Sequence, residues 1–245
     1  MHDFPAGRLA VWATAWLAGR TSYDDALDGI MGETAHRVAG LPGTEEAVSL
    51  GRALTELRRL GEQRFRLVLP VPGDVRGLPR VPGLAPLALE TGQAAVGTQL
   101  VVVPEPLGPE VIQWTAFPLD GVPPAPPAPE GNLRAVSGAL DLAVGDTARA
   151  LAGLDVARWN PEVPALLLGL SRTTAAPGLP DDHDPLALSV LGRAQRLGKV
   201  LDLAMADAPG AAVNHAQAAA RDEALRPLAR AVREATEAAF NAVPR

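Results

Sequence analysis

The densest group of chemically capable side chains is the run Asp181-Asp182-His183-Asp184. Three carboxylates and an imidazole within four residues are donor types that hard or borderline divalent cations accept. His183 can also act as a general acid or base, with Asp181 and Asp182 beside it. Consecutive residues converge on one ion only if the backbone wraps around it, and Asp184 followed by Pro185 is a typical helix start. The competing interpretation is a solvated turn that leads into a helix.

Glu33 and His36 form a second candidate metal pair. On a helix, their spacing of three residues places both side chains on one face. Di-iron carboxylate bundles use two such Glu-x-x-His pairs, but this chain contains no second pair. The alternative is a histidine packed and hydrogen-bonded beside an apolar stripe.

Nucleophilic catalysis has little support in the sequence. The chain has no cysteine, and none of its serines lies in a Gly-x-Ser-x-Gly elbow. Ser171 with His183 and an aspartate of the same loop is the one arrangement worth testing. The glycines between residues 73 and 83 match neither a phosphate loop nor a dinucleotide fingerprint, so no cofactor is predicted.

Charge is unevenly distributed along the chain. The segment 52–80 is basic, whereas residues 21–46 are acidic. Such asymmetry favours docking of a protein partner or of a second copy, with Arg58, Arg64 and Arg66 as the contact residues. An ordinary solvated surface with internal ion pairs is the alternative. Nucleic acid is not an expected partner, because the net charge is −6 and base-stacking aromatics are missing from the basic segment.

The composition is rich in alanine, arginine, glycine and proline, as in proteins encoded by GC-rich bacterial genomes, and in this respect the chain resembles proteins of high-GC actinobacteria. The apolar run 9–19 is too short to span a bilayer, and its helical spacing indicates a core helix rather than a secretory signal. No membrane association is expected. The absence of cysteine fits a cytoplasmic location.

The secondary structure predicted to position these residues changes along the chain, from helices to strands and back to helices. Helices are expected at 5–19, 22–38 and 44–60, followed by short antiparallel strands at 64–69, 87–89, 100–103 and 111–117. Residues 122–131 contain five prolines and read as a semi-rigid linker. Beyond them the periodicity is helical, with helices from 132, from 184 and from about 213 to 242, the last with a kink or restart at Pro227.

The predicted fold class is therefore α+β. A small, mainly antiparallel sheet of four or five strands packs with N-terminal helices and is followed by a helical bundle. The predicted domains are 1–121, the linker 122–131, and 132–245, with one shared core as the alternative.

Three functions remain open. The leading prediction is a non-enzymatic cytoplasmic protein that acts through protein–protein contacts as a homodimer. The first alternative is a hydrolase or metal-assisted enzyme that uses residues 181–184. The second is a small-molecule sensor with an apolar pocket between sheet and bundle, near Trp114 and Trp159.

Overall fold

The structure is a computed structural model that describes residues 4–123, 132–153, 178–206 and 215–242. These residues form two compact units, each described here by itself. The N-terminal unit comprises residues 4–123 together with the short segment 178–183. The helical unit comprises 132–153, 184–206 and 215–242. The proposed domain boundary stays a prediction, because residues 124–131 of the linker lie outside the described ranges.

The N-terminal unit is built on one sheet. Within the described residues it has six strands in the order β2-β1-β6-β5-β4-β3. The strands are β1 (Ala35–Ala39), β2 (Val48–Ser49), β3 (Arg66–Val68), β4 (Ala94–Val96), β5 (Leu100–Pro106) and β6 (Val111–Pro118). All neighbours are antiparallel except β1 and β6, which run parallel. The α+β class is confirmed. The predicted small sheet of four or five strands is wrong, since the sheet has six strands and is mixed through its one parallel pair, β1 and β6.

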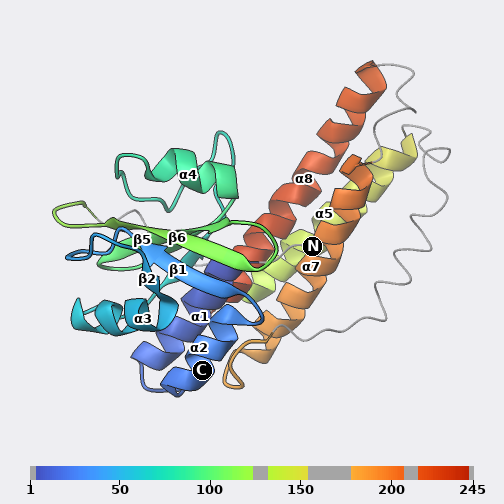
Figure 1. The fold of residues 1–245 in the computed structure, drawn as a ribbon. Helices are drawn as coiled ribbons and strands as arrows, with labels where there is room; N and C mark the ends of the chain where they lie inside the picture. The colour runs from blue at the N-terminus through green and yellow to red at the C-terminus, as the bar shows by residue number, and fades with distance from the viewer. Residues whose placement is uncertain (1–3, 124–131, 154–177, 207–214, 243–245) are drawn as a thin grey trace. The chain divides into compact units, whose positions relative to one another are not determined.

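Helices cover both faces of this sheet (Figure 1). One face carries α4 (Leu84–Thr91), and the other carries α1 (Pro5–Leu17), α2 (Tyr23–Met31) and α3 (Leu50–Arg59). Val101 and Val103 of β5 belong to the core under α4, together with Val68, Leu84 and Ala88. Leu100 and Val102 are also buried. Because side chains alternate along a strand, burial on both faces explains the unbroken apolar run of β5.

Two of the predicted helix boundaries are wrong. The second helix ends at Met31, because Gly32 takes a positive φ of 55° and closes it. Residues 35–39 then form β1, with His36 and Val38 directed inward. Thr44 caps no helix; its hydroxyl donates to Leu41 O, and the third helix begins only after Ser49, whose Oγ accepts from Arg52 N.

The predicted strand at 87–89 is also wrong, since it lies inside α4. Left-handed glycines bound this helix on both sides, Gly83 at φ 80° and Gly92 at φ 71°. Pro86 lies in its first turn, where the missing N–H has no helical partner to lose. The other predicted strands are found, and β1, β2 and β4 are additional ones.

The helical unit consists of three long helices in its described part: α5 (Leu133–Gly153), α7 (Pro185–Ala206) and α8 (His215–Phe240). α8 packs along both α5 and α7, which contact each other much less (Figure 1). The predicted stripe of α8 is confirmed, because these side chains are all buried: Leu225, Leu228, Val232, Ala235 and Ala239. Of the predicted kink or restart at Pro227, the restart is wrong, since α8 continues through this residue, and the kink stays a prediction.

Among the described residues, none of the helices combines the length and the apolar character that crossing a membrane requires.

Candidate functional site

The first two helices of the N-terminal unit approach each other unusually closely. A Cβ added at Gly29 of α2 would lie 2.2 Å from Cε2 of Trp12 on α1. The α2 backbone therefore covers the indole, and only glycine permits this contact. One turn along, a Cβ at Gly32 would lie 3.0 Å from an Arg8 guanidinium nitrogen. These two glycines bring Trp12 and Arg8 to the border between α1 and α2.

The segment 178–183 completes this region from far along the chain. Trp12 Nε1 donates a hydrogen bond to Gly178 O at 2.8 Å. Arg20 forms an ion pair with Asp182. Two contacts across more than 160 residues thus hold this segment against the N-terminal helices.

A cleft of about 800 Å³ lies between these parts. Its lining combines an indole, hydroxyls, prolines and glycines with both signs of charge. The lining residues are Arg8, Trp12, Arg20, Thr21, Ser22, Asp25, Asp28, Gly29, Gly32, Gly178, Pro180, Asp181 and Asp182. All of them belong to the N-terminal unit. This volume falls within the range of about 300–1,000 Å³ that small-molecule sites occupy.

The structure places the four residues of the predicted run 181–184 in different surroundings. Asp181 and Asp182 are exposed and line the cleft, whereas His183 is buried and is not among its lining residues. Asp184 caps α7, its Oδ1 accepting from Leu186 N at 2.7 Å, with Pro185 as the first helical residue. The helix start read from the sequence is confirmed. His183 is not positioned beside Asp181 and Asp182 at the cleft.

Glu33 and His36 do not share a helix face. Glu33 is exposed after α2, and His36 lies buried on β1. Trp114 Nε1 donates to His36 Nδ1 at 3.2 Å, and His36 Nε2 lies 2.8 Å from Thr34 Oγ1. Thr34 Oγ1 donates onward to Met31 O. Since indole nitrogen is only a donor, Nδ1 must accept, and these bonds hold the imidazole as part of the core.

For the remaining predicted site residues, the structure describes only some of the side chains. Ser171 and Trp159 lie outside the described residues, so the predicted Ser171–His183 arrangement has no geometry here. Trp114 is completely buried within the N-terminal unit, and the predicted sensor pocket stays a prediction. In the described ranges, no three acidic or histidine side chains gather closely enough to hold a metal ion.

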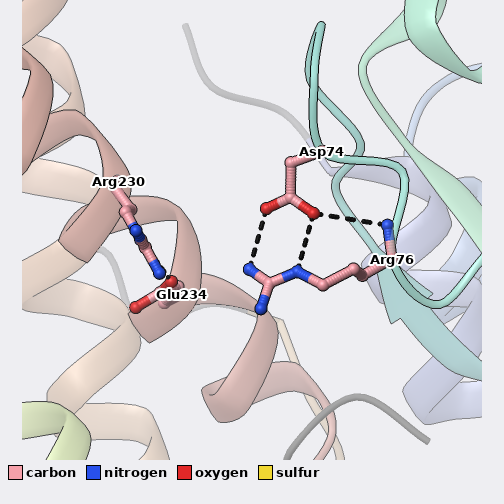
Figure 2. Close-up of polar contacts among 4 residues, drawn as sticks. All are labelled: Asp74, Arg76, Arg230 and Glu234. Carbon is pink, nitrogen blue, oxygen red and sulfur yellow. Dashed lines mark hydrogen bonds and ion pairs between the residues drawn. The ribbon is translucent and has the colours of Figure 1, made fainter. Parts of the chain in front are cut away.

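The basic segment 52–80 has many internal partners. Arg58 lies 3.8 Å above the Trp16 ring and donates to Trp16 O, and Arg66 donates to Gly77 O. Arg76 binds the Asp74 carboxylate through two nitrogens, at 2.8 and 2.9 Å (Figure 2). Of the three predicted contact residues, Arg64 is exposed without such an internal role in the described part of the chain.

A smaller hollow of about 200 Å³ borders α3 and the loop before it. There Arg59 binds Glu56 through Nε and Nη2. This hydrogen bonding by Arg59 lowers the pKa of Glu56, and Glu56 in turn raises the pKa of Arg59. Glu56 and Arg59 thus neutralise each other, and Arg52 is the further charged residue in the lining of this hollow.

The cleft residues on α1 and α2 were not predicted from the sequence. Trp12 reads there as a core residue, and Arg8 and Arg20 as the ends of an apolar run. One local signal points to them, namely Gly29 inside an otherwise regular helix, which indicates close packing or function.

Comparison with known proteins shows which family and which individual proteins the chain is similar to. Residues 6–130 match the family described as Rv1486c-like protein, N-terminal domain, and residues 134–237 match Rv1486c-like protein, C-terminal domain. The chain is 29% identical to "Uncharacterized protein Rv1486c" of Mycobacterium tuberculosis, covering 98% of this chain and 96% of that protein. It is 26% identical to "Uncharacterized protein ML1804" of Mycobacterium leprae, covering 98% and 97%.

No solved structure matches the chain. The N-terminal family match alone spans more than half of the sequence, and the second match covers most of the remainder. The chain belongs to the Rv1486c-like protein family.

Proposed function

We propose that this protein works by binding, and that the cleft of its N-terminal unit receives a small polar molecule. The observation that carries this proposal is the cleft itself, about 800 Å³ in volume and bordered by α1, α2 and the segment 178–182. Ligand sites combine an apolar wall with a few placed polar groups. Here the wall is the Trp12 indole, and the polar groups are the hydroxyls of Thr21 and Ser22 and the charged side chains. We place this activity in the cytoplasm, as the sequence predicts.

A thermal-shift screen of the full chain against metabolites tests this function, since a ligand bound only by the folded state raises the melting temperature. Thr21→Trp fills the cleft and is expected to remove the shift caused by any hit. Thr55→Trp, exposed on α3 outside the cleft, is the matched control and is expected to keep it. A screen without hits, or hits that Thr21→Trp leaves unchanged, would refute the proposal.

Protein–protein contact remains a second candidate function, with a homodimer as the expected assembly. It is favoured by large apolar side chains exposed on the helical unit: Leu142 at 71%, Leu203 at 39% and Met205 at 57%. Such side chains are common at contact surfaces between proteins.

Native mass spectrometry of the untagged protein tests this candidate and reports bound ligands at the same time. A dimer that Leu142→Glu dissociates, and that Arg64→Glu leaves intact, would place the contact on α5. Dissociation by Arg64→Glu would place it on the basic segment, as the charge pattern predicts. A monomer at all protein concentrations would rule the dimer out.

The enzyme hypothesis gains one observation, because Asp181 and Asp182 border the cleft. His183 is buried and does not line the cleft, so the structure gives it no contact with a ligand there. The enzyme hypothesis therefore requires that His183→Ala removes a hydrolytic or metal-assisted activity while ligand binding in the cleft is retained.

A further inference from the structure

We infer that the ligand of the cleft is an organic cation that carries amino groups. This inference rests on the proposed binding function and adds the ligand's chemistry. It starts from two carboxylates, Asp28 on α2 and Asp181 on the segment 178–183, which line the cleft from separate parts of the chain. Neither side chain has a hydrogen bond or an ion pair with any described residue, so both can accept from a ligand.

The other charged groups of the cleft are partly neutralised within the protein. Arg20 is paired with Asp182, and the Asp25 carboxylate accepts a hydrogen bond of 2.6 Å from Ser22 Oγ. Two arginines against four aspartates leave the lining with a net charge of −2 at neutral pH. A concave surface with an excess of negative charge favours positively charged ligands, so the cleft favours cations over anions.

The aromatic wall favours an organic cation. Trp12 is the tryptophan of the cleft, and its ring is held on one face by Gly29 and at Nε1 by Gly178 O. Indole is the aromatic group that cations prefer, and alkylammonium groups also bury their methylene carbons against it. Because the ring is already fixed, ligand binding does not have to order it.

The placement of the carboxylates favours several amino groups over a single metal ion. A divalent cation needs several oxygens that converge on one point. In the described residues, no three acidic or histidine side chains gather closely enough to hold a metal ion, and Asp28 and Asp181 come from separate segments of the chain. A polyamine carries its charges at separate points along a flexible apolar chain, which matches this pattern.

Isothermal titration calorimetry of the full chain with putrescine and spermidine, at low ionic strength, tests the inference. We expect both to bind, and spermidine more tightly because it has one more charge. Asp28→Asn and Asp181→Asn should each weaken spermidine binding by up to about fivefold, the range of a solvent-exposed ion pair. Asp24→Asn is the matched control, since Asp24 is exposed on the same helix but does not line the cleft.

Each other outcome overturns the inference in a distinct way. Equal weakening by Asp24→Asn would show diffuse attraction to an acidic surface without a site. Tighter binding of Mg²⁺, with loss of spermidine binding in its presence, would identify a metal site. If a different molecule from the thermal-shift screen occupies the cleft while polyamines do not bind, the inference fails and the binding function stands. If nothing binds, both fail.

Discussion

At the scale of single residues, buried polar side chains organise the N-terminal unit. Glu62 is only 4% exposed, yet it carries a carboxylate. Its oxygens accept from Thr98 N, Thr98 Oγ1, Gln99 N and Gln63 N at 2.6–3.0 Å. Gly97 makes room for this arrangement, since a Cβ there would lie 2.2 Å from Glu62 Oε2. A buried carboxylate with this many donors is satisfied, and it shapes the turn between β4 and β5.

Glu62→Ala should lower the free energy of unfolding by about 1–3 kcal/mol, because it leaves several part-buried donors without their acceptor. Urea unfolding of the full chain measures the change. Glu90→Ala, at an exposed position of α4, is the control and should change stability by less than about 0.5 kcal/mol. Equal stability of the two variants would contradict the assigned role.

Gly29→Ala should destabilise the protein by about 1–3 kcal/mol, because the new methyl group would overlap the Trp12 indole. Gly138→Ala on α5 is the matched helical control. No atom lies within 4 Å of a Cβ at Gly138, so alanine should stabilise there by up to about 1 kcal/mol. Thermal unfolding measures both signs, and a stabilising Gly29→Ala would contradict the close helix contact.

At the scale of elements, most helices follow the local rules of capping and periodicity. α7 begins where an aspartate precedes a proline, and α8 buries the face that its period predicts. The exception is Pro227 within α8, where proline removes one backbone hydrogen bond.

Pro227→Ala should stabilise α8 by about 1–3 kcal/mol, since alanine restores the N–H and relieves the proline ring from the preceding turn. Pro185→Ala is the control, because proline at the first helical position costs nothing there. Far-UV circular dichroism during thermal unfolding compares the two. An unchanged or lower melting temperature in Pro227→Ala would show that packing requires the proline.

The Glu56–Arg59 pair gives α3 a pH dependence of known sign. Because the folded-state pKa of Glu56 is lowered by its bond to Arg59, the pair stabilises above the unfolded pKa and loses this contribution as pH falls through the folded pKa. NMR titration should find the Glu56 pKa below its ordinary value. Arg59→Gln should raise that pKa, and Arg52→Gln should raise it less, since Arg52 is a weaker cause. An unchanged Glu56 pKa in Arg59→Gln would contradict the pairing.

In the whole molecule, a segment that comes late in the sequence belongs to the unit formed by the first part of the chain. Residues 178–183 follow α5 in the sequence, but they belong to the N-terminal unit. The cleft therefore exists only where a late segment returns to the first two helices.

This return predicts energetic coupling between Arg20 and Asp182, which are 162 residues apart. A double-mutant cycle with Arg20→Gln and Asp182→Asn should show a coupling free energy of up to about 1 kcal/mol, since both side chains are partly exposed. Equilibrium unfolding of the four proteins measures it. Strict additivity would show that the segment is not held by this pair.

Features that arise from neighbouring residues could be predicted from the amino-acid sequence. The sequence predicted the α+β class, the helix start at Asp184, the stripe of α8 and the hairpin strands β5 and β6, because caps, periods and turns act over a few residues.

Features that depend on partners distant in sequence became visible in the folded structure. Residues 35–39 have apolar positions compatible with either a helix or a strand, and their pairing with β6 makes them a strand. His36 lies in the core because Trp114, distant in sequence, donates to it. Asp28 and Asp181 line the same cleft because residues 178–183 lie against α1 and α2. The physical reason is the same in each case: burial and hydrogen bonding between distant segments outweigh weak local preferences.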